Sequence, residues 1–139
     1  MKFVINMDPM ASPRPRFTNR GGFVKSYMPK DYMDWKKQFL LVWSLYQADK
    51  FAQGKPLFVK VGFYIAPPAA LSKVKKNAEA LRTEVMPVVK KPDIDNLVKS
   101  VLDAVNGYAW HDDNQISDLY AKKRYSLKPR VEIEITELE

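Results

Sequence analysis

The segment 93–107 constrains the fold most, because its apolar residues recur at helical spacing. They stand at i, i+3, i+4, i+7, i+8 and i+11: Ile94, Leu97, Val98, Val101, Leu102 and Val105. Such a series forms one continuous stripe along a helix, which must be buried against another element. Asp93 is suited to capping the first turn, and Gly107 is a common residue after a helix end. The sequence therefore predicts an amphipathic helix over this segment.

Charged residues form a row beside that stripe. Asp95, Lys99 and Asp103 are spaced by four residues, so they line up along the exposed side of the predicted helix. A second acidic pair, Asp112–Asp113, follows after a short turn. Hard divalent cations prefer carboxylate ligands, and in phosphodiester hydrolysis they activate water and neutralise charge. We interpret these acids as a divalent-metal site for cutting phosphodiester bonds.

Candidate roles can be assigned within this site. Asp93 and Asp95 flank the helix start, where their short side chains can converge on one ion. Asp112–Asp113 lies roughly 20 Å from that start by helix length, so the chain has to double back for these acids to join it. Lys99, one turn beyond Asp95, is placed to orient the attacking water or to stabilise charge at the phosphate.

Each of these residues also has an ordinary structural interpretation. Asp93 alone reads as a helix cap, and Asp95 with Lys99 reads as an exposed pair worth a few tenths of a kcal/mol. Asp112–Asp113 alone reads as a turn, and His111, the only histidine, as part of that turn. From the residues alone, both interpretations stay open.

The distribution of charge favours a polyanionic partner. The 139-residue chain has a formal net charge of +7. Residues 93–118 contain six aspartates and one lysine, a local charge of −5, so the remainder carries +12. A mainly basic surface attracts nucleic acid, whereas an acidic island inside it repels phosphate unless a cation is bound there.

Basic residues that precede this island in the sequence are candidate nucleic-acid contacts. Residues 8–17 are rich in proline and predict an irregular segment from which Arg14 and Arg16 project. Lys90 and Lys91 come directly before the first acid. A solvated entry loop is the alternative for the arginines. The basic segment Lys73–Lys76 is either a further nucleic-acid contact or a solvated helix.

The remaining pattern predicts an α+β fold. Strands are expected at 2–7, 23–27, 57–65, 115–125 and 131–136, a long aromatic-striped helix up to about Gln47, and a weaker helix at 71–82. The chain length predicts one domain, 1–139. Because the regular βαβ alternation is missing, we expect this domain to have two layers, with helices on a mostly antiparallel mixed sheet. No cysteine and no apolar run of ~20 residues is present, so we expect a cytoplasmic protein without disulfides or a membrane partner.

The motif Asp93-Ile94-Asp95-Asn96-Leu97-Val98-Lys99, with Asp103-Ala104, Asn106-Gly107, Trp110-His111-Asp112-Asp113 and Gln115 after it, resembles the RusA-type Holliday junction resolvases. These crossover junction endodeoxyribonucleases come from phages and prophages. Pro13-Arg14-Pro15-Arg16 is also similar to the N-terminal segment of that family.

The resemblance implies a RusA-like fold and a homodimer that cuts four-way DNA junctions by paired symmetric nicks, in DNA recombination and repair. It implies Mg²⁺ as cofactor, with Mn²⁺ as an expected substitute, and no organic cofactor. By position, Asp93, Asp95 and Asp113 match the essential acids of the family and Lys99 its essential lysine. The choice of Asp113 over Asp112 rests on the resemblance.

Two other functions compete with this one. The first is a non-catalytic nucleic-acid-binding module in which the aspartates only cap and solvate. The second is a metal-dependent phosphatase acting on small nucleotides, which the excess of basic residues disfavours.

Overall fold

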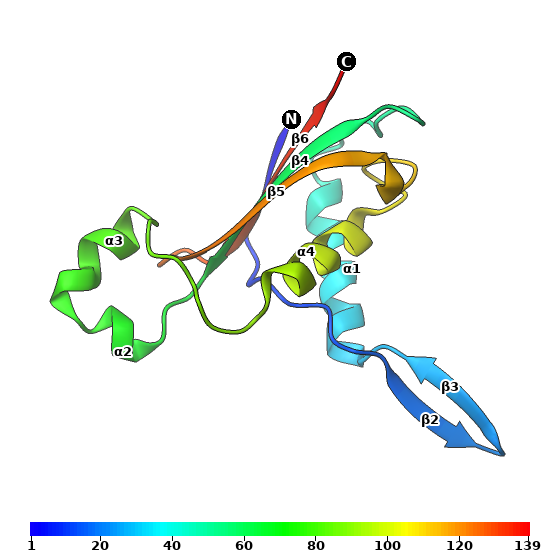
Figure 1. Ribbon diagram of the computed structural model, residues 1–139, viewed down its shortest axis with the longest axis horizontal. Coiled ribbons are helices and arrows are strands. Elements are labelled where there is room, and N and C mark those ends of the chain that lie inside the picture. Colours follow the sequence, from blue (N-terminus) through cyan, green and yellow to red (C-terminus); the bar gives the residue numbers. More distant parts are fainter.

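A four-stranded mixed sheet forms the centre of the computed structural model, which describes residues 1–139 (Figure 1). Its strands, in the order β1-β6-β4-β5, are β1 (Lys2–Ile5), β6 (Arg130–Glu137), β4 (Leu57–Ile65) and β5 (Ile116–Tyr125). Strand β6 is antiparallel to both β1 and β4, whereas β5 is parallel to β4. The mostly antiparallel α+β sheet expected from the sequence is confirmed.

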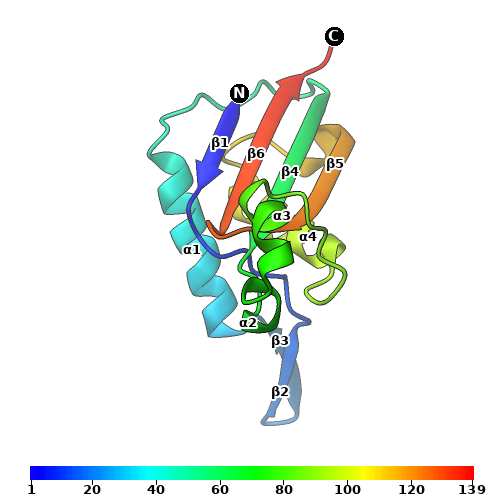
Figure 2. The same ribbon diagram turned by 90° about the vertical axis from the view of Figure 1, so that its left-hand side faces the viewer.

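Two helices cover one face of this sheet, and the other face is largely open (Figures 1 and 2). They are α1 (Lys30–Ser44) and α4 (Ile94–Val105). Alternate residues of the strands point toward these helices and form the core with Phe39, Leu97 and Trp110, all fully buried. This layer arrangement buries the apolar stripe of α4 and leaves its other side accessible.

Helix α4 follows the predicted pattern except at its first residue. Leu97, Val101 and Val105 are buried, while Ile94 is 37% exposed, so its expected burial is wrong. Ile94 is the first residue of α4. Asp95, Lys99 and Asp103 are all exposed, as the spacing predicted.

Helix α1 buries most of the predicted aromatic stripe, while Tyr46 stays 45% exposed, and the helix ends earlier than expected. Tyr32, Phe39 and Trp43 are buried, and the Tyr46 hydroxyl both accepts from and donates to the backbone of Val4 on β1. The helix stops at Ser44 rather than near Gln47, because the chain tightens into i→i+3 bonds and Gln47 adopts a φ of 51°.

A two-stranded hairpin replaces part of the irregular N-terminal segment. Strands β2 (Arg16–Arg20) and β3 (Phe23–Tyr27) pair antiparallel and project away from the sheet and helices (Figure 1). Gly21 and Gly22 connect them with φ values of 61° and 82°. Two consecutive positive φ angles define a tight hairpin turn, which glycine adopts without strain. The expectation of irregular backbone through residue 17 missed this pairing.

The segment expected as one helix at 71–82 is divided into short pieces. They are α2 (Ala69–Ser72), η1 (Lys75–Asn77) and α3 (Ala78–Arg82), held by a small apolar cluster of Leu81, Val88 and Tyr125. A last short turn, η2 (Asp113–Gln115), precedes β5. None of the helices has the length and apolar character needed to cross a membrane.

An arginine-centred ion cluster ties the chain after α3 to the start of β6. Arg130 donates two hydrogen bonds to the carboxylate of Glu84, at 2.6 and 2.9 Å, and one to Glu132 at 2.7 Å. Its guanidinium also lies 4.0 Å from the ring centre of Tyr64. Glu132 is therefore paired on the sheet, with Arg130 and with Lys2.

Replacing Arg130 with Met should lower the free energy of unfolding by about 2 kcal/mol. The side chains of Arg130 and Glu84 are only 16% and 26% exposed, so the variant leaves the carboxylate of Glu84 partly buried without a cation. The hydrogen bonds from Arg130 lower the pKa of Glu84 below its usual 4.5, so their contribution is present above that pH and lost as the pH falls through the lowered pKa. Urea unfolding of both proteins at pH 7 and at pH 3 measures this. An equal deficit at the two pH values would contradict the ionic origin.

Candidate active site

The first two candidate acids lie at the N-terminal end of α4, where both are exposed. Asp93 occupies the N-cap position with extended backbone angles, but its side chain makes no capping hydrogen bond. Asp95 lies in the first turn, where its Oδ1 accepts from the amide of Asn96 at 2.9 Å. Neither carboxylate has a lysine or arginine within ion-pair distance, since the six ion pairs of the chain lie elsewhere.

The loop before Asp93 is held in place by Lys123 of β5. Its Nζ donates to the carbonyl oxygens of Lys90 and Pro92, at 2.9 and 2.8 Å. In the sequence, Lys123 looks like one of three consecutive basic residues, 122–124. Only the alternation of side chains along β5 distinguishes it, because it places Lys123 on the same face of the sheet as Phe63. Lys123 therefore positions the start of α4, a function that the sequence-based interpretation missed.

The N-terminal segment also meets this end of α4. The amide of Ser12 donates to the carbonyl of Asn96 at 2.9 Å, which fixes the chain two residues before Arg14 against the first turn of the helix. Arg14 is exposed, as are Lys90 and Lys91 on the loop leading to Asp93. Three of the four predicted basic contacts thus lie on segments anchored beside Asp93 and Asp95.

Lys99 extends the same surface by one helical turn. It is exposed and has no carboxylate within ion-pair distance, Asp95 and Asp103 included. The interpretation of Asp95 and Lys99 as a surface salt bridge is therefore not realised. The ammonium group is free to interact with an anionic ligand.

Asp112 and Asp113 lie at the opposite end of α4, and Asp112 has a structural role there. Its carboxylate accepts from the amide of Asn114, at a long 3.5 Å, as the cap of η2. Gln115 completes the capping box and donates from Nε2 to the carbonyls of Ala52 and Lys55, at 2.9 and 3.0 Å. The buried Gln115 thus fixes the turn that presents Asp113.

Asp113 is the acid with a perturbed charge state. Partial burial raises its pKa, and the hydrogen bond and negative charge of Asp112 and the charge of Asp103 raise it further. Three aspartates are therefore electrostatic neighbours with no basic partner among them. A bound cation would relieve this repulsion.

The chain does not gather Asp93, Asp95 and Asp113 into one ligand group. No set of three or more carboxylate or histidine side chains is arranged to hold a metal ion. The segment that returns to the start of α4 is the far end of β5, with Lys123, whereas η2 stays beside the end of the helix (Figure 1). About 18 Å of helix separates the two acidic groups.

The donor chemistry nevertheless fits a hard divalent cation at either acidic group. Mg²⁺ is commonly held by one or two carboxylates, while water and substrate phosphates complete its coordination. Asp93 with Asp95, and Asp113 with its acidic neighbours, each offer exposed carboxylates without basic partners. The single chain does not supply a complete set of metal ligands from its own side chains.

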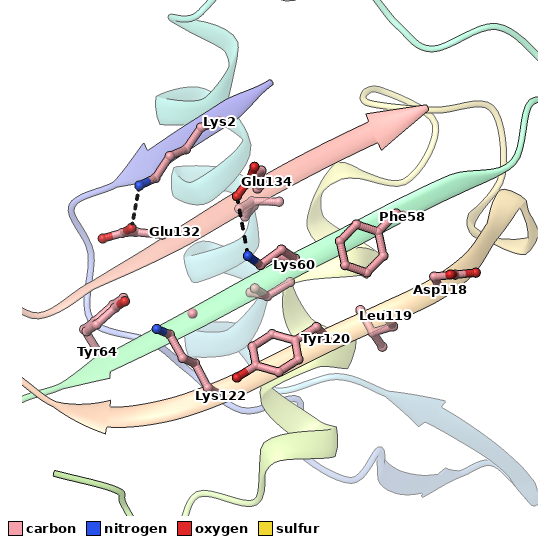
Figure 3. Close-up of a pocket in the computed structure, with 13 residues that line it drawn as sticks. Lys2, Phe58, Lys60, Tyr64, Asp118, Leu119, Tyr120, Lys122, Glu132 and Glu134 are labelled. Atoms are coloured by element: carbon pink, nitrogen blue, oxygen red, sulfur yellow. Dashed lines mark ion pairs between the residues drawn. The ribbon is translucent and has the colours of Figure 1, made fainter. Parts of the chain in front are cut away.

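A broad hollow lies on the open face of the sheet, away from α4 (Figure 3). Its volume is about 870 Å³. Its charges are mostly compensated in pairs: Lys2 with Glu132 at 3.1 Å and Lys60 with Glu134 at 4.0 Å. It contains none of the candidate site residues, so its size does not identify the site.

Comparison with known proteins finds similarity along most of the chain. The family model Endodeoxyribonuclease RusA matches residues 6–136. Over 138 residues, 99% of this chain and 96% of the relative, the chain is 36% identical to the uncharacterized protein YqaN of Bacillus subtilis strain 168. It is 37% identical to the crossover junction endodeoxyribonuclease rusA of Lactococcus phage r1t over 89 residues, 63% of this chain and 60% of that one.

The matched region contains β4, β5, nearly all of β6, the projecting hairpin and all of α4, so both acidic groups and Lys99 lie inside it. A family model that covers nearly the whole chain identifies its membership. The chain belongs to the RusA family of endodeoxyribonucleases.

Proposed function

We propose that this protein resolves four-way DNA junctions by metal-dependent hydrolysis of two symmetric phosphodiester bonds. The observation that carries the proposal is the exposed row of Asp95, Lys99 and Asp103 on α4, none of them neutralised by an ion pair. Family membership supports DNA as the substrate. The relative from Lactococcus phage r1t, whose name is crossover junction endodeoxyribonuclease, supports a branched substrate.

The chain's residues divide the work between binding and chemistry. Arg14, Arg16, Lys90 and Lys91 would bind phosphates on both sides of the helix start, with no acid to neutralise them. Lys99 would donate to the scissile phosphate, where negative charge increases as water attacks.

We propose Mg²⁺ as the cofactor, with Mn²⁺ able to replace it. When bound, such an ion supplies an activated water and neutralises the phosphate oxygens. Asp93 and Asp95 would hold it at the start of α4, and Asp113 is the third proposed ligand residue. Because Asp113 lies at the other end of the helix, we expect its contribution to depend on the assembled protein–DNA complex.

A homodimer suits this function, because resolution requires two equivalent cuts on opposing strands. A twofold assembly supplies two copies of α4 related by the symmetry of the junction. We propose that the dimer works in the cytoplasm, in DNA recombination and repair. Sedimentation of the protein with and without junction DNA tests the stoichiometry.

The function is tested by incubating the protein with a synthetic four-way junction and, separately, a linear duplex of the same sequence, in Mg²⁺. We expect strand cuts in the junction and none in the duplex. A junction that is bound but uncut in both Mg²⁺ and Mn²⁺ would favour the non-catalytic binding module. Turnover of mononucleotides with the junction ignored would favour a phosphatase.

Asp112 and Asp113 should respond differently to replacement by Asn. Asp113→Asn should lower junction cleavage at least tenfold yet stabilise the free protein slightly at pH 7, by up to about 1 kcal/mol, because it removes a repelled charge. Since that pKa is raised in the fold, the stabilisation should vanish below about pH 3.8, where the wild-type carboxyl is protonated in both states.

Asp112→Asn is the matched control, because asparagine is also a good cap and can retain the turn. It should keep most of the cleavage activity. Thermal unfolding with added Mg²⁺ gives a readout besides activity: Mg²⁺ should raise the melting temperature of wild type more than that of Asp113→Asn. Equal responses would remove Asp113 from the proposed ligands.

A further inference from the structure

The β2–β3 hairpin is a surface that the proposed chemistry does not explain. Its two strands pair with each other and make no extensive contact with any other helix or strand. It projects from the body beyond the start of α1 (Figure 1). An isolated two-stranded hairpin gains little stability in water, so this one does not serve the core.

The two faces of the hairpin differ in chemistry. The cross-strand pairs Arg16–Tyr27, Thr18–Lys25 and Arg20–Phe23 place six side chains on one face, which we call the cationic face. The opposite face carries Phe17 with Ser26 and Asn19 with Val24. The cationic face thus combines three positive charges with two aromatic rings.

The positive charge of this face is not compensated within the chain. Between Asp8 and Asp31 the sequence contains no acidic residue. Arg16, Arg20 and Lys25 are exposed and take part in no ion pair. Phe23, at the tip, is 74% exposed.

The dimensions of the hairpin match a DNA groove. Arg16 and Arg20 are separated by about 14 Å along β2, with Lys25 between them on the partner strand. Each DNA strand carries one phosphate per about 3.4 Å of helix axis, so the three cations can contact several phosphates. The major groove, about 12 Å wide, admits a two-stranded ribbon.

We propose that the hairpin is a DNA-binding arm, which rests its cationic face on the phosphates of a duplex arm of the substrate. This inference depends on the proposed function for its substrate and adds Arg20 and Lys25 to the binding residues. Because Arg16 opens β2 two residues after Arg14, the arm continues the basic surface beside Asp93 and Asp95. The protein would thus hold a length of duplex beyond the cutting site.

The test measures junction affinity at a series of salt concentrations in EDTA, so that cleavage cannot interfere. The slope of log K against log salt should be less steep by about 2 in the double variant Arg20→Ala/Lys25→Ala, if each residue neutralises one phosphate. The charge-preserving variant Arg20→Lys/Lys25→Arg should keep the wild-type slope. Asn19→Ala/Ser26→Ala, on the opposite face, should also keep it.

The outcomes separate the arm from the proposed function. If wild type and the Ala variant bind the junction with the same salt slope, the hairpin is not a DNA-binding arm, and the proposed nuclease function still stands. Failure of wild type to bind the junction at all overturns both. An unchanged slope combined with loss of the dimer overturns DNA binding and assigns the hairpin to subunit contact.

Discussion

Replacing Asp95 with Asn should reduce junction cleavage by at least about 10³-fold, equivalent to about 4 kcal/mol of activation free energy. The carboxylate is exposed, lies in the first turn of α4 and has no basic partner, so its charge is available to a cation. Asparagine keeps the shape and can accept the same hydrogen bond from the amide of Asn96. Loss of activity would therefore report the lost charge rather than a distorted helix.

Binding should respond in the opposite direction. Removing a negative charge next to the DNA phosphates should leave the affinity for the junction unchanged or increase it in EDTA. Single-turnover cleavage and a mobility-shift titration measure the two effects on the same protein. Cleavage that survives in Asp95→Asn would show that Asp95 is not part of the catalytic site.

Asp31 provides a matched control on α1. It is also the second residue of its helix, and its Oδ1 accepts from the amide of the next residue, Tyr32, at 2.8 Å. Asp31→Asn therefore makes the same chemical change in the same local geometry on a different helix. We expect it to cut junctions at close to the wild-type rate, which would place the effect of Asp95→Asn in the site.

Replacing Lys99 with Met should lower the cleavage rate by 10² to 10³-fold, about 2.7–4 kcal/mol, the usual cost of losing one charge-stabilising donor. Methionine retains the apolar stem, and Lys99 makes no ion pair that the change would break. Affinity should fall much less, with a change in salt slope of about 0.9 for one phosphate.

The ratio of the two effects decides the role of Lys99. A cleavage rate at saturating protein that equals wild type would identify it as a binding residue only. Lys99→Arg keeps the charge and should retain part of the activity. Lys37→Met, an exposed lysine on α1, is the control for removal of a helical lysine and should leave the cleavage rate nearly unchanged.

The parts of the fold that could be predicted are those that periodicity determines. The stripe of α4, the alternation of β4 and β6 and the aromatic face of α1 each repeat over enough residues to specify both the element and its buried side. Strand β3 was predicted at 23–27, but its partner β2 was missed because Phe17 is exposed and no buried face gives that strand a pattern. Only the Gly21–Gly22 pair signalled the turn.

The sequence predicted which residues belong to the candidate site but not how all of them are arranged in space. Spacing placed Asp95, Lys99 and Asp103 on one exposed face, because a single helix determines their relation. The relation of Asp93 to Asp113 depends on how the chain returns after α4. That return brings Lys123, not Asp113, to the helix start, through hydrogen bonds to backbone carbonyls that no side-chain pattern encodes.

The most direct test of paired, metal-dependent cutting uses a supercoiled plasmid that extrudes a four-way junction. Two symmetric cuts within one bound complex convert the plasmid directly to linear DNA, whereas independent single cuts accumulate nicked circles. We expect linear product to appear without prior nicked circle in Mg²⁺, and no product in EDTA. A plasmid that is bound but stays supercoiled in Mg²⁺ and Mn²⁺, or that stops at nicked circle, would contradict the proposed resolvase.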